Sequence, residues 1–537
     1  MLVGDVAFIK KGMFTGENEL FFRMWFEPSF QAIDFEINDR FEIAEGNYIP
    51  MNSGGQYRRW YGNRLNIIKF DKMHYDMISV NKGHRNPQFY FQKAATWTKI
   101  TSGKFSLRLS EGGFINNDAS MAIYEKSVAL EIIVGLLNSK VAQYYLNLLN
   151  ESLNYTTGNV ASVPFISRIK MSNIKNLVVE NVKLSNYDWD SYETSWNFKR
   201  HPLFQTVTNL ADAYVVWKTD CEQRFKQLKT NEEKLNRILI DVYGLQDELT
   251  PDVADKDITV HRIFDTKDDI PEYMKGSNYV LTRRDVIVSL ISYAVGCMFG
   301  RYSLDVEGLA YAGGNWDSSK YATYIPDADN ILPITDEEYF KDDIVGMFCA
   351  WVKKVYGPDT LEENLDFIAS ALGNKGNSSR EVIRNYFLKD FFKDHCKTYQ
   401  KRPIYWLFDS GKQNGFKALV YLHRYNADTI GNLRVDYLHR MQRVYESEIN
   451  RMQDMIDNST NAREVAASTK RKDKLQKQLK ECREYDEKIG HLALSRIELD
   501  LDDGVKVNYR KVQTARDGKF YEVLADSKNI MGKQRGK

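Results

Sequence analysis

The chain has 537 residues, of which 43% are hydrophobic, and this is the composition of an ordinary folded protein with more than one core. Its 74 basic and 73 acidic side chains leave a net charge of +1, which excludes a general attraction to phosphate. Any contact with nucleic acid must therefore come from a local patch of charge.

The cysteines and the apolar runs indicate the compartment. The five cysteines are widely spaced and form no CxxC pair, so they are read as reduced thiols and indicate neither a disulfide framework nor a zinc site. The N-terminus has no basic-then-apolar signal pattern. The longest apolar stretch, 286–299, is too short to span a bilayer and predicts a buried core helix. We therefore predict a cytoplasmic protein without membrane contact.

Residues 1 to about 125 read as strands, with short apolar runs separated by Gly, Asn and Asp. Within them, the stretch 52–63 combines glycines, adjacent arginines and three aromatic rings: Tyr57, Arg58, Arg59, Trp60 and Tyr61 form its centre. Arg offers a fork of donors to guanine or phosphate, aromatic rings brace that fork, and glycines allow a close backbone approach to a ligand. The alternative is a β-hairpin with core aromatics and solvated arginines, and these residues alone do not decide between the two.

A second basic and aromatic segment follows in the same module. It contains Arg85, Lys93, Trp97 and Lys99, so that one β-rich module can line a groove with both segments. Residues 127–149 carry apolar residues at helical spacing and predict one amphipathic helix that closes a first domain over 1–185.

The middle of the chain, 186–345, reads as a helical domain. We predict a long helix over about 209–229 and a second over 234–243, which the capping-box pattern of Thr230 to Glu233 opens. Asp190 and Glu193 suggest an acidic metal pair, but without further ligands a capping and linker role is the better interpretation.

Residues 346–433 form an α/β segment with a predicted strand pair within 403–425. Arg402 and Arg424 border these apolar runs, either as phosphate contacts or as ordinary surface. The last segment, 434–537, has apolar residues spaced by threes and fours on two stretches and predicts an antiparallel helical hairpin with a tail. The second helix carries a run of lysines, read first as a solvated face and second as a contact for phosphate or an acidic partner.

Several of these motifs together resemble a known family. The stretch 52–63, read with 4–7, 12–18 and 23–25, resembles the start of the target-recognition half of PglX, the adenine-specific DNA methyltransferase of BREX phage-defence systems, which is related to type IIG restriction-modification enzymes. Further matches follow along nearly the whole chain, at residues 136–140, 188–203, 300–305, 361–426 and 500–509. The resulting fold class is α+β and multidomain: a β-rich target-recognition module, mainly α-helical domains and a C-terminal antiparallel helical hairpin.

The chemistry of that family requires a motif that this sequence lacks. An adenine amino-methyltransferase uses Asn/Asp-Pro-Pro-Tyr/Phe to hold the flipped base, and among the eleven prolines here no two are adjacent. No HExxH, P-loop or GxSxG motif is present either. We therefore predict no catalytic residue, no metal site and no activity of this chain alone. The resemblance implies that S-adenosylmethionine binds to a catalytic domain outside it.

The predicted function is the recognition of double-stranded DNA beside a separate methyltransferase domain or other BREX proteins. Arg58, Arg59, Arg85 and Lys93 are predicted base or phosphate contacts, braced by Tyr57, Trp60 and Tyr61. Further contacts are predicted at Lys99, Arg402 and Arg424. The alternative from another class is a protein-interaction scaffold of a defence complex that touches DNA little or not at all, and a steep loss of DNA affinity with salt would count against it.

Overall fold

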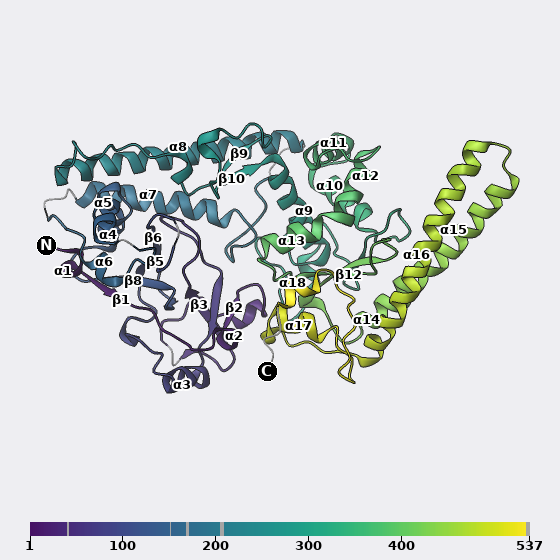
Figure 1. Cartoon of the computed structure of the whole chain (residues 1–537), viewed down its shortest axis with the longest axis horizontal. Helices are drawn as coiled ribbons and strands as arrows, with labels where there is room; N and C mark the ends of the chain where they lie inside the picture. Colours follow the sequence, from purple (N-terminus) through teal and green to yellow (C-terminus); the bar gives the residue numbers. More distant parts are fainter. Residues whose placement is uncertain (40–41, 102, 151, 168–170, 205–208, 533–537) are drawn as a thin grey trace. The chain divides into compact units, whose positions relative to one another are not determined.

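A computed structural model describes residues 1–39, 42–101, 103–150, 152–167, 171–204 and 209–532 (Figure 1). The chain groups into two compact units, each made of segments that are separated in sequence. Unit 1 consists of Met1–Trp25, Phe30–Pro202 and Tyr214–Asp285, and unit 2 of Phe26–Ser29, Leu203–Ala213 and Val286–Lys537.

Unit 1 contains two four-stranded sheets. The first is antiparallel, with strand order β1-β8-β5-β6, and the second has the order β2-β4-β3-β7 with β3 and β7 parallel. The strands of the first are β1 (Ala7–Lys10), β5 (Ala94–Thr98), β6 (Leu107–Ser110) and β8 (Ser120–Glu125). Those of the second are β2 (Phe22–Met24), β3 (Tyr48–Asn52), β4 (Asn66–Lys69) and β7 (Ile115–Asn116). A short parallel pair, β9 (Arg262–Phe264) and β10 (Val280–Thr282), completes the strands of the unit.

Each sheet has its own apolar core. Trp97 and Ile123 of the first sheet share a large buried cluster with Ile133, Val178 and Leu239 from three helices. The second sheet forms a smaller cluster from residues of β3, β4, β7 and the helix α3 (Lys72–Val80). Burial of this apolar surface is the main term that holds the strand-rich module together.

The helices of unit 1 differ from the prediction at two places. The single helix expected over 127–149 is wrong, because the chain forms α4 (Leu130–Leu137) and α5 (Lys140–Leu149) instead. The break is built by Asn138, whose side chain bonds the backbone N–H and C=O of Leu107, and by Ser139, whose hydroxyl caps α5 at the N–H of Ala142. The remaining helices of the unit are α1 (Val3–Val6), α2 (Asn18–Phe21), α6 (Thr157–Ala161) and α7 (Met171–Asp190).

The second difference is the helix α8 (Leu210–Tyr243), which runs without interruption for 34 residues. The prediction that a second helix starts after Thr230 to Glu233 is therefore wrong. Glu232 does not cap a helix but points into the interior, where its side chain is 2% exposed. Leu228 and Leu235 continue the buried face of the helix on either side of it, so the apolar period outweighs the local capping signal.

Unit 2 is mainly helical around one small sheet. The antiparallel sheet has the strand order β11-β13-β12, with β11 (Ile331–Pro333), β12 (Tyr405–Asp409) and β13 (Lys417–Tyr421), so the region 403–425 does contain a strand pair. The central helix α9 (Arg283–Phe299) buries nearly all of its second half. Among the described residues, no helix combines the length and the apolarity that crossing a bilayer requires. The other helices are α10 (Ile344–Tyr356), α11 (Leu361–Leu372), α12 (Ser379–Lys389), α13 (Phe391–Thr398), α14 (Thr429–Asn432), α17 (Val505–Lys511) and α18 (Ser527–Met531).

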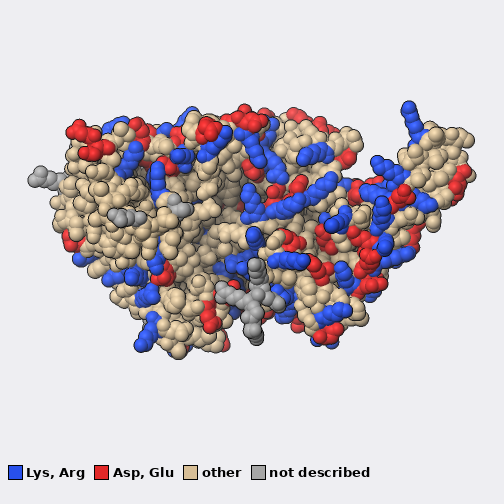
Figure 2. Space-filling view, viewed as in Figure 1, with Lys and Arg blue, Asp and Glu red and all other residues tan. Residues whose placement is uncertain are grey.

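A long antiparallel hairpin of α15 (His439–Asn458) and α16 (Ala462–Ser495) stands out from unit 2 (Figure 1). Its predicted seam is buried at Tyr445, Met452, Leu475 and Cys482. Basic and acidic side chains are interspersed over the hairpin (Figure 2), and its lysine run is partly neutralised, since Arg471 and Lys474 both pair with Asp336.

The predicted fold class, α+β and multidomain with a C-terminal helical hairpin, is confirmed. The limits of the four domains proposed from the sequence stay a prediction. The two compact units are groupings by contact, and they combine segments that are separated in sequence.

Candidate nucleic-acid interface

The basic and aromatic run 52–63 lies in the loop between β3 and β4, and most of its side chains point into unit 1. Arg58 is 3% exposed, and its guanidinium donates to the Asp188 carboxylate of α7 at 2.9 Å and to the carbonyls of Tyr61 and Ser185. The guanidinium also stacks over the ring of Trp189. Arg58 thus joins the loop to α7.

Asp188 is the centre of this buried network. It is completely buried, and it accepts the backbone N–H of His261 at 2.8 Å and contacts the His261 ring nitrogen Nδ1 at 3.0 Å. Arg224 of α8 lies 3.6 Å away. Burial alone raises the pKa of Asp188, but His261, Arg58 and Arg224 outweigh it and hold this pKa well below its usual range.

Arg59 and Trp60 dock on α8 in the same way. Both donate to Glu232, Arg59 from its guanidinium to Oε2 and Trp60 from its indole Nε1 to Oε1, at 2.5 and 2.7 Å. Burial raises the pKa of Glu232 although Arg59 and Trp60 favour its charged form. We call the set Arg58, Arg59, Trp60, Asp188 and Glu232 the helix clamp.

These positions correct the roles assigned to the run. Arg58 and Trp60 are internal supports, because their donors are taken by buried acceptors and their side chains are inaccessible to a duplex. Tyr61 is also buried, against the Arg64 guanidinium, and Tyr57 is half-buried with its hydroxyl near the backbone of Asp257. The alternative of a hairpin with solvated arginines does not describe the loop either. Within the run, Arg59 lines a pocket, which is described below.

Four basic residues of unit 1, Lys11, Lys82, Arg85 and Lys99, lie on loops that meet beside the ends of several strands. The loops 11–17, 53–56, 82–86, 99–101 and 117–119 meet there, and we call them the strand-end cluster. Backbone hydrogen bonds join them: Met13 N–H donates to Asn116, Phe14 N–H to Gly83, and Lys99 N–H to Ala119. Buried amides support the cluster from below, with Asn52 donating to Asn116 at 2.9 Å and Asn117 to the Ser53 hydroxyl at 2.7 Å.

Glycines permit the close approach of these loops. A Cβ on Gly12 would lie 2.0 Å from the carbonyl oxygen of Asn117, and one on Gly83 would lie 1.9 Å from that of Phe14. Gly54 of the run 52–63 acts likewise, since a Cβ there would lie 2.9 Å from the carbonyl oxygen of Ala119, whereas a Cβ on Gly55 or Gly62 would meet the side chains of Asn63 and Arg58. The close approaches are therefore to other residues of the chain itself.

Two predicted contact residues come together in the strand-end cluster. Arg85 and Lys99 both bind Asp118, at 2.7 and 3.3 Å, so that one carboxylate lies between two cations. Their side chains remain 40% and 28% exposed. Phe14, 47% exposed, lies beside the Arg85 guanidinium. Over its five loops the cluster has four basic side chains and two acidic ones, Lys11, Lys82, Arg85 and Lys99 against Glu17 and Asp118.

Sequence reasoning did not select Phe14, Lys11 or Asp118. The available signal was the segment 12–18, which carried the family resemblance but no charge pattern of its own. Asp118 is one acid in a short turn, and its role depends on a contact with Arg85, 33 residues away.

Lys93, Arg402 and Arg424 are bound by other partners. Lys93 precedes β5 whereas Lys99 follows it, so the two lie at opposite ends of the strand, and Lys93 pairs with Glu131 of α4. In unit 2, Arg402 pairs with the buried Glu27, and Arg424 donates to the carbonyls of Phe299, Asp327 and Ala328. Within unit 1, Lys93 therefore lies outside the strand-end cluster.

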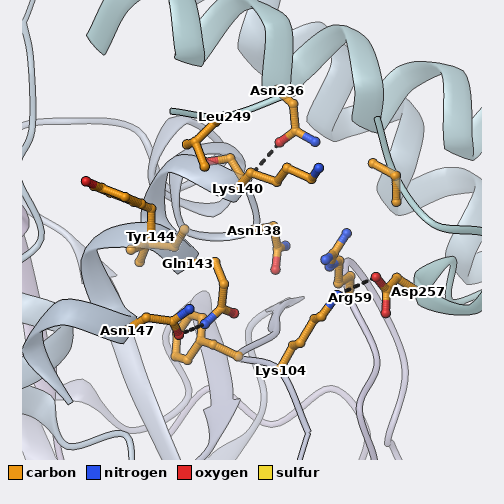
Figure 3. Close-up of a pocket in the computed structure, with 14 residues that line it drawn as sticks. Arg59, Lys104, Asn138, Lys140, Gln143, Tyr144, Asn147, Asn236, Leu249 and Asp257 are labelled. Carbon is orange, nitrogen blue, oxygen red and sulfur yellow. Dashed lines mark hydrogen bonds and ion pairs between the residues drawn. The ribbon is translucent and has the colours of Figure 1, made fainter. Parts of the chain in front are cut away.

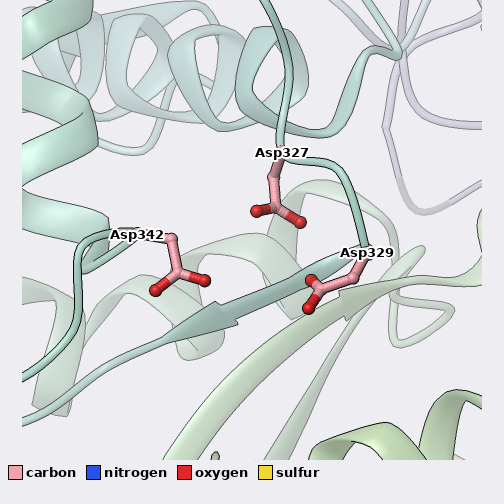
Figure 4. Close-up of side chains that lie close together, drawn as sticks. All are labelled: Asp327, Asp329 and Asp342. Atoms are coloured by element: carbon pink, nitrogen blue, oxygen red, sulfur yellow. The ribbon is translucent and has the colours of Figure 1, made fainter. Parts of the chain in front are cut away.

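Unit 2 also contains a group of three carboxylates. Oxygens of Asp327, Asp329 and Asp342 lie within 4.8 Å of one another (Figure 4). The Tyr437 hydroxyl lies between Asp329 and Asp342, and the Ile331 N–H donates to Asp327. Burial, and then the charge of Asp329, raise the pKa of Asp327 to about 7, so this group binds a proton more tightly than a free carboxylate does.

Comparison with known proteins shows which proteins the chain resembles. No family model matches the sequence. The adenine-specific methyltransferase PglX of Lacticaseibacillus casei (strain Zhang) is 40% identical over 531 residues, which is 95% of this chain and 42% of that protein. The chain is related to PglX. The resemblance to this family predicted from the sequence is thereby confirmed.

A second PglX relative gives the same coverage. The adenine-specific methyltransferase BrxX of Escherichia coli O9:H4 (strain HS) is 36% identical over 546 residues, 97% of this chain and 43% of that protein. The chain thus spans less than half the length of these PglX relatives. Among solved structures, the type IIL restriction-modification enzyme MmeI in complex with DNA matches 46% of this chain and 34% of that one, at 12% identity and a TM-score of 0.29. That likeness is too weak to support a conclusion.

Proposed function

We propose that the chain is the DNA-recognition part of a PglX-like, site-specific adenine-N6 DNA methyltransferase of a BREX phage-defence system. The relation to two adenine-specific methyltransferases along nearly the whole chain carries this proposal. The relatives are more than twice as long as the aligned region, which leaves room for a catalytic part that these residues do not include.

The residues present do not fit the binding of S-adenosylmethionine. Open α/β sheets bind ligands at the carboxyl ends of adjacent parallel strands. Within the described ranges, parallel pairing in a sheet is limited to β3 with β7 and β9 with β10, over two and three residue pairs. With no adjacent prolines, the adenine-holding motif is also missing. Methyl transfer is therefore assigned to a part of the protein, or a partner, beyond this chain.

The strand-end cluster is the surface we assign to DNA. Its charge is positive by two, whereas the whole chain has a net charge of +1, so the cluster supplies the local patch that phosphate binding requires. Exposed ion pairs such as those of Asp118 contribute only about 0–1 kcal/mol, so Arg85 and Lys99 can exchange this carboxylate for a phosphate at little cost. The helix clamp holds the loop 53–56 on α7 and α8 behind this surface.

A mobility-shift titration on mixed duplexes at two salt concentrations tests the proposal. The R85A/K99A variant is expected to bind more weakly, and its logarithmic salt dependence is expected to be shallower by about 0.9 for each phosphate that the variant no longer neutralises. K93A is the matched control, since Lys93 flanks the same strand and has its own carboxylate partner but lies outside the strand-end cluster. Added S-adenosylmethionine should change neither result.

Two results would contradict the proposal. Equal binding by R85A/K99A and the unmodified chain would remove the strand-end cluster from the interface. Absence of salt-sensitive binding by the unmodified chain would favour the scaffold function, in which other proteins of a defence complex are the ligands.

A further inference from the structure

Unit 1 contains a pocket of about 260 Å³ that the proposed function does not use (Figure 3). Its wall is formed by the loop between β5 and β6, by α5, by α8 and by the segment that follows α8. Leu137, Leu249 and Val253 supply an apolar part of the lining, and polar side chains supply the rest. Apolar walls with a few convergent polar groups are typical of small-molecule sites.

Three basic side chains from separate elements extend into this pocket: Arg59 from the β3–β4 loop, Lys104 from the β5–β6 loop and Lys140 from α5 (Figure 3). The single acid of the lining, Asp257, pairs with Lys104. Lys140 has one weak contact, 3.5 Å from its ammonium to the Thr250 hydroxyl. Glu232 pairs with Arg59 from behind the lining, so among the described residues Lys140 is the cation of the lining without an acidic partner, and a phosphate or carboxylate would neutralise it.

Arg59 is fixed in place before any ligand arrives. Glu232 binds one of its terminal nitrogens at 2.5 Å. This contact holds the guanidinium at the lining of the pocket.

Two amides of α5, Gln143 and Asn147, also line the pocket. Gln143 donates to Asn147 at 2.6 Å across one turn of α5. With this bond made, the side-chain oxygen of Gln143 can still accept a hydrogen bond and the side-chain nitrogen of Asn147 can still donate one. If the oxygen and nitrogen of both amides changed places, the pair would still offer one acceptor and one donor. An adjacent acceptor and donor match the amino and ring-nitrogen edge of a nucleobase.

We propose that this pocket binds a nucleotide, with its phosphate at Arg59, Lys104 and Lys140 and its base edge at Gln143 and Asn147. The site is formed by other residues than the strand-end cluster, so it does not rest on the proposed function. The nucleotide has two possible sources with the same chemistry: a free nucleoside monophosphate, or one nucleotide of a strand whose base has left its stack.

Calorimetric titration of the full chain with AMP, and with adenosine as the probe without phosphate, tests the proposal. AMP is expected to bind with one site per chain and more tightly than adenosine. K140A and Q143A should each lower its affinity by about tenfold, the loss of one hydrogen bond or charge interaction. Ala is a good helix former at both positions, so α5 should persist. K93A, a lysine outside the pocket, is the control and should bind AMP normally.

The second source is tested with a single-stranded oligonucleotide that contains 2-aminopurine. A change in its fluorescence that K140A and Q143A abolish, without binding of AMP, assigns the pocket to a nucleotide within a strand. Binding of neither probe, or binding that persists unchanged in both variants, overturns the proposal. R85A/K99A separates the two hypotheses, because it should lose duplex binding and keep AMP binding.

Discussion

Arg58 and Asp188 are both almost inaccessible to solvent. A buried ion pair of this kind affects stability mainly when one of its partners is removed. The desolvation of two charges offsets much of their attraction. A single charge left in the interior has no such compensation. Asp188 keeps His261 and Arg224 as further partners, so it would remain charged beside a cavity.

Arg58→Ala is therefore expected to lower the free energy of unfolding by about 3 kcal/mol, the lower end of the range for breaking a buried pair. Urea unfolding followed by tryptophan fluorescence measures it. Arg85→Ala is the matched control, since this arginine also pairs with an aspartate but lies at the surface, and its loss should cost less than about 1 kcal/mol. Equal effects of the two substitutions would show that the helix clamp is not a stabilising contact.

Asp327 gives unit 2 a dependence on pH. Its pKa is raised from 3.8 to about 7 in the folded chain, so between these values the folded state binds more protons than the unfolded state. The contribution of the protonated Asp327 carboxyl group to the free energy of unfolding is therefore complete below about pH 4, and it is lost as the pH rises through 7.

Asp327→Asn removes the charge and keeps the shape. At pH 8 the variant is expected to be more stable than the unmodified chain by a few kcal/mol, because each unit by which the pKa is raised corresponds to about 1.4 kcal/mol. Near pH 4 the two proteins are expected to differ little in stability. Thermal unfolding at both pH values measures the difference. A gain of equal size at both would show that the carboxyl group does not titrate in this range.

At the scale of elements, hydrophobic periodicity located the strands and the C-terminal hairpin, because both are set by repeating apolar positions. It could not locate where helices are divided. The break at Asn138 depends on the backbone of Leu107, 31 positions away, and the side chain of Glu232, which resembled a cap, is bound by Arg59, 173 positions away. Local patterns contain no information about such partners.

The arrangement of the strand-end loops predicts a strong effect of one methyl group. Gly12→Ala places a Cβ against the fixed backbone of Asn117, so either loop must shift, at a cost of about 1–3 kcal/mol. Thermal unfolding measures this, and duplex binding should weaken with it although no charge is removed. Gly103→Ala is the control, because its Cβ would meet only ordinary contacts. Similar effects of the two substitutions would exclude the close approach as their cause.

At the scale of the whole molecule, the sequence was sufficient for the fold class and for the family relation, and only partly for the site. Arg85 and Lys99 were selected by charge and do lie together, because the Asp118 carboxylate lies between them. Arg58 and Trp60 were selected for the same composition, yet buried acids on α7 and α8 occupy them. A basic and aromatic run looks alike whether it meets a phosphate or a distant carboxylate.

The helix clamp has a consequence for attempts to retarget such a protein. Randomised libraries confined to 53–56, 82–86 and 117–119 would vary the outer surface while the anchoring arginines and tryptophan stay in place. Libraries that include 58–60 would consist mainly of misfolded members. Under the proposed function, new specificities are therefore to be sought in three short windows, and the arginine-containing stretch 58–60 is the one to leave unchanged.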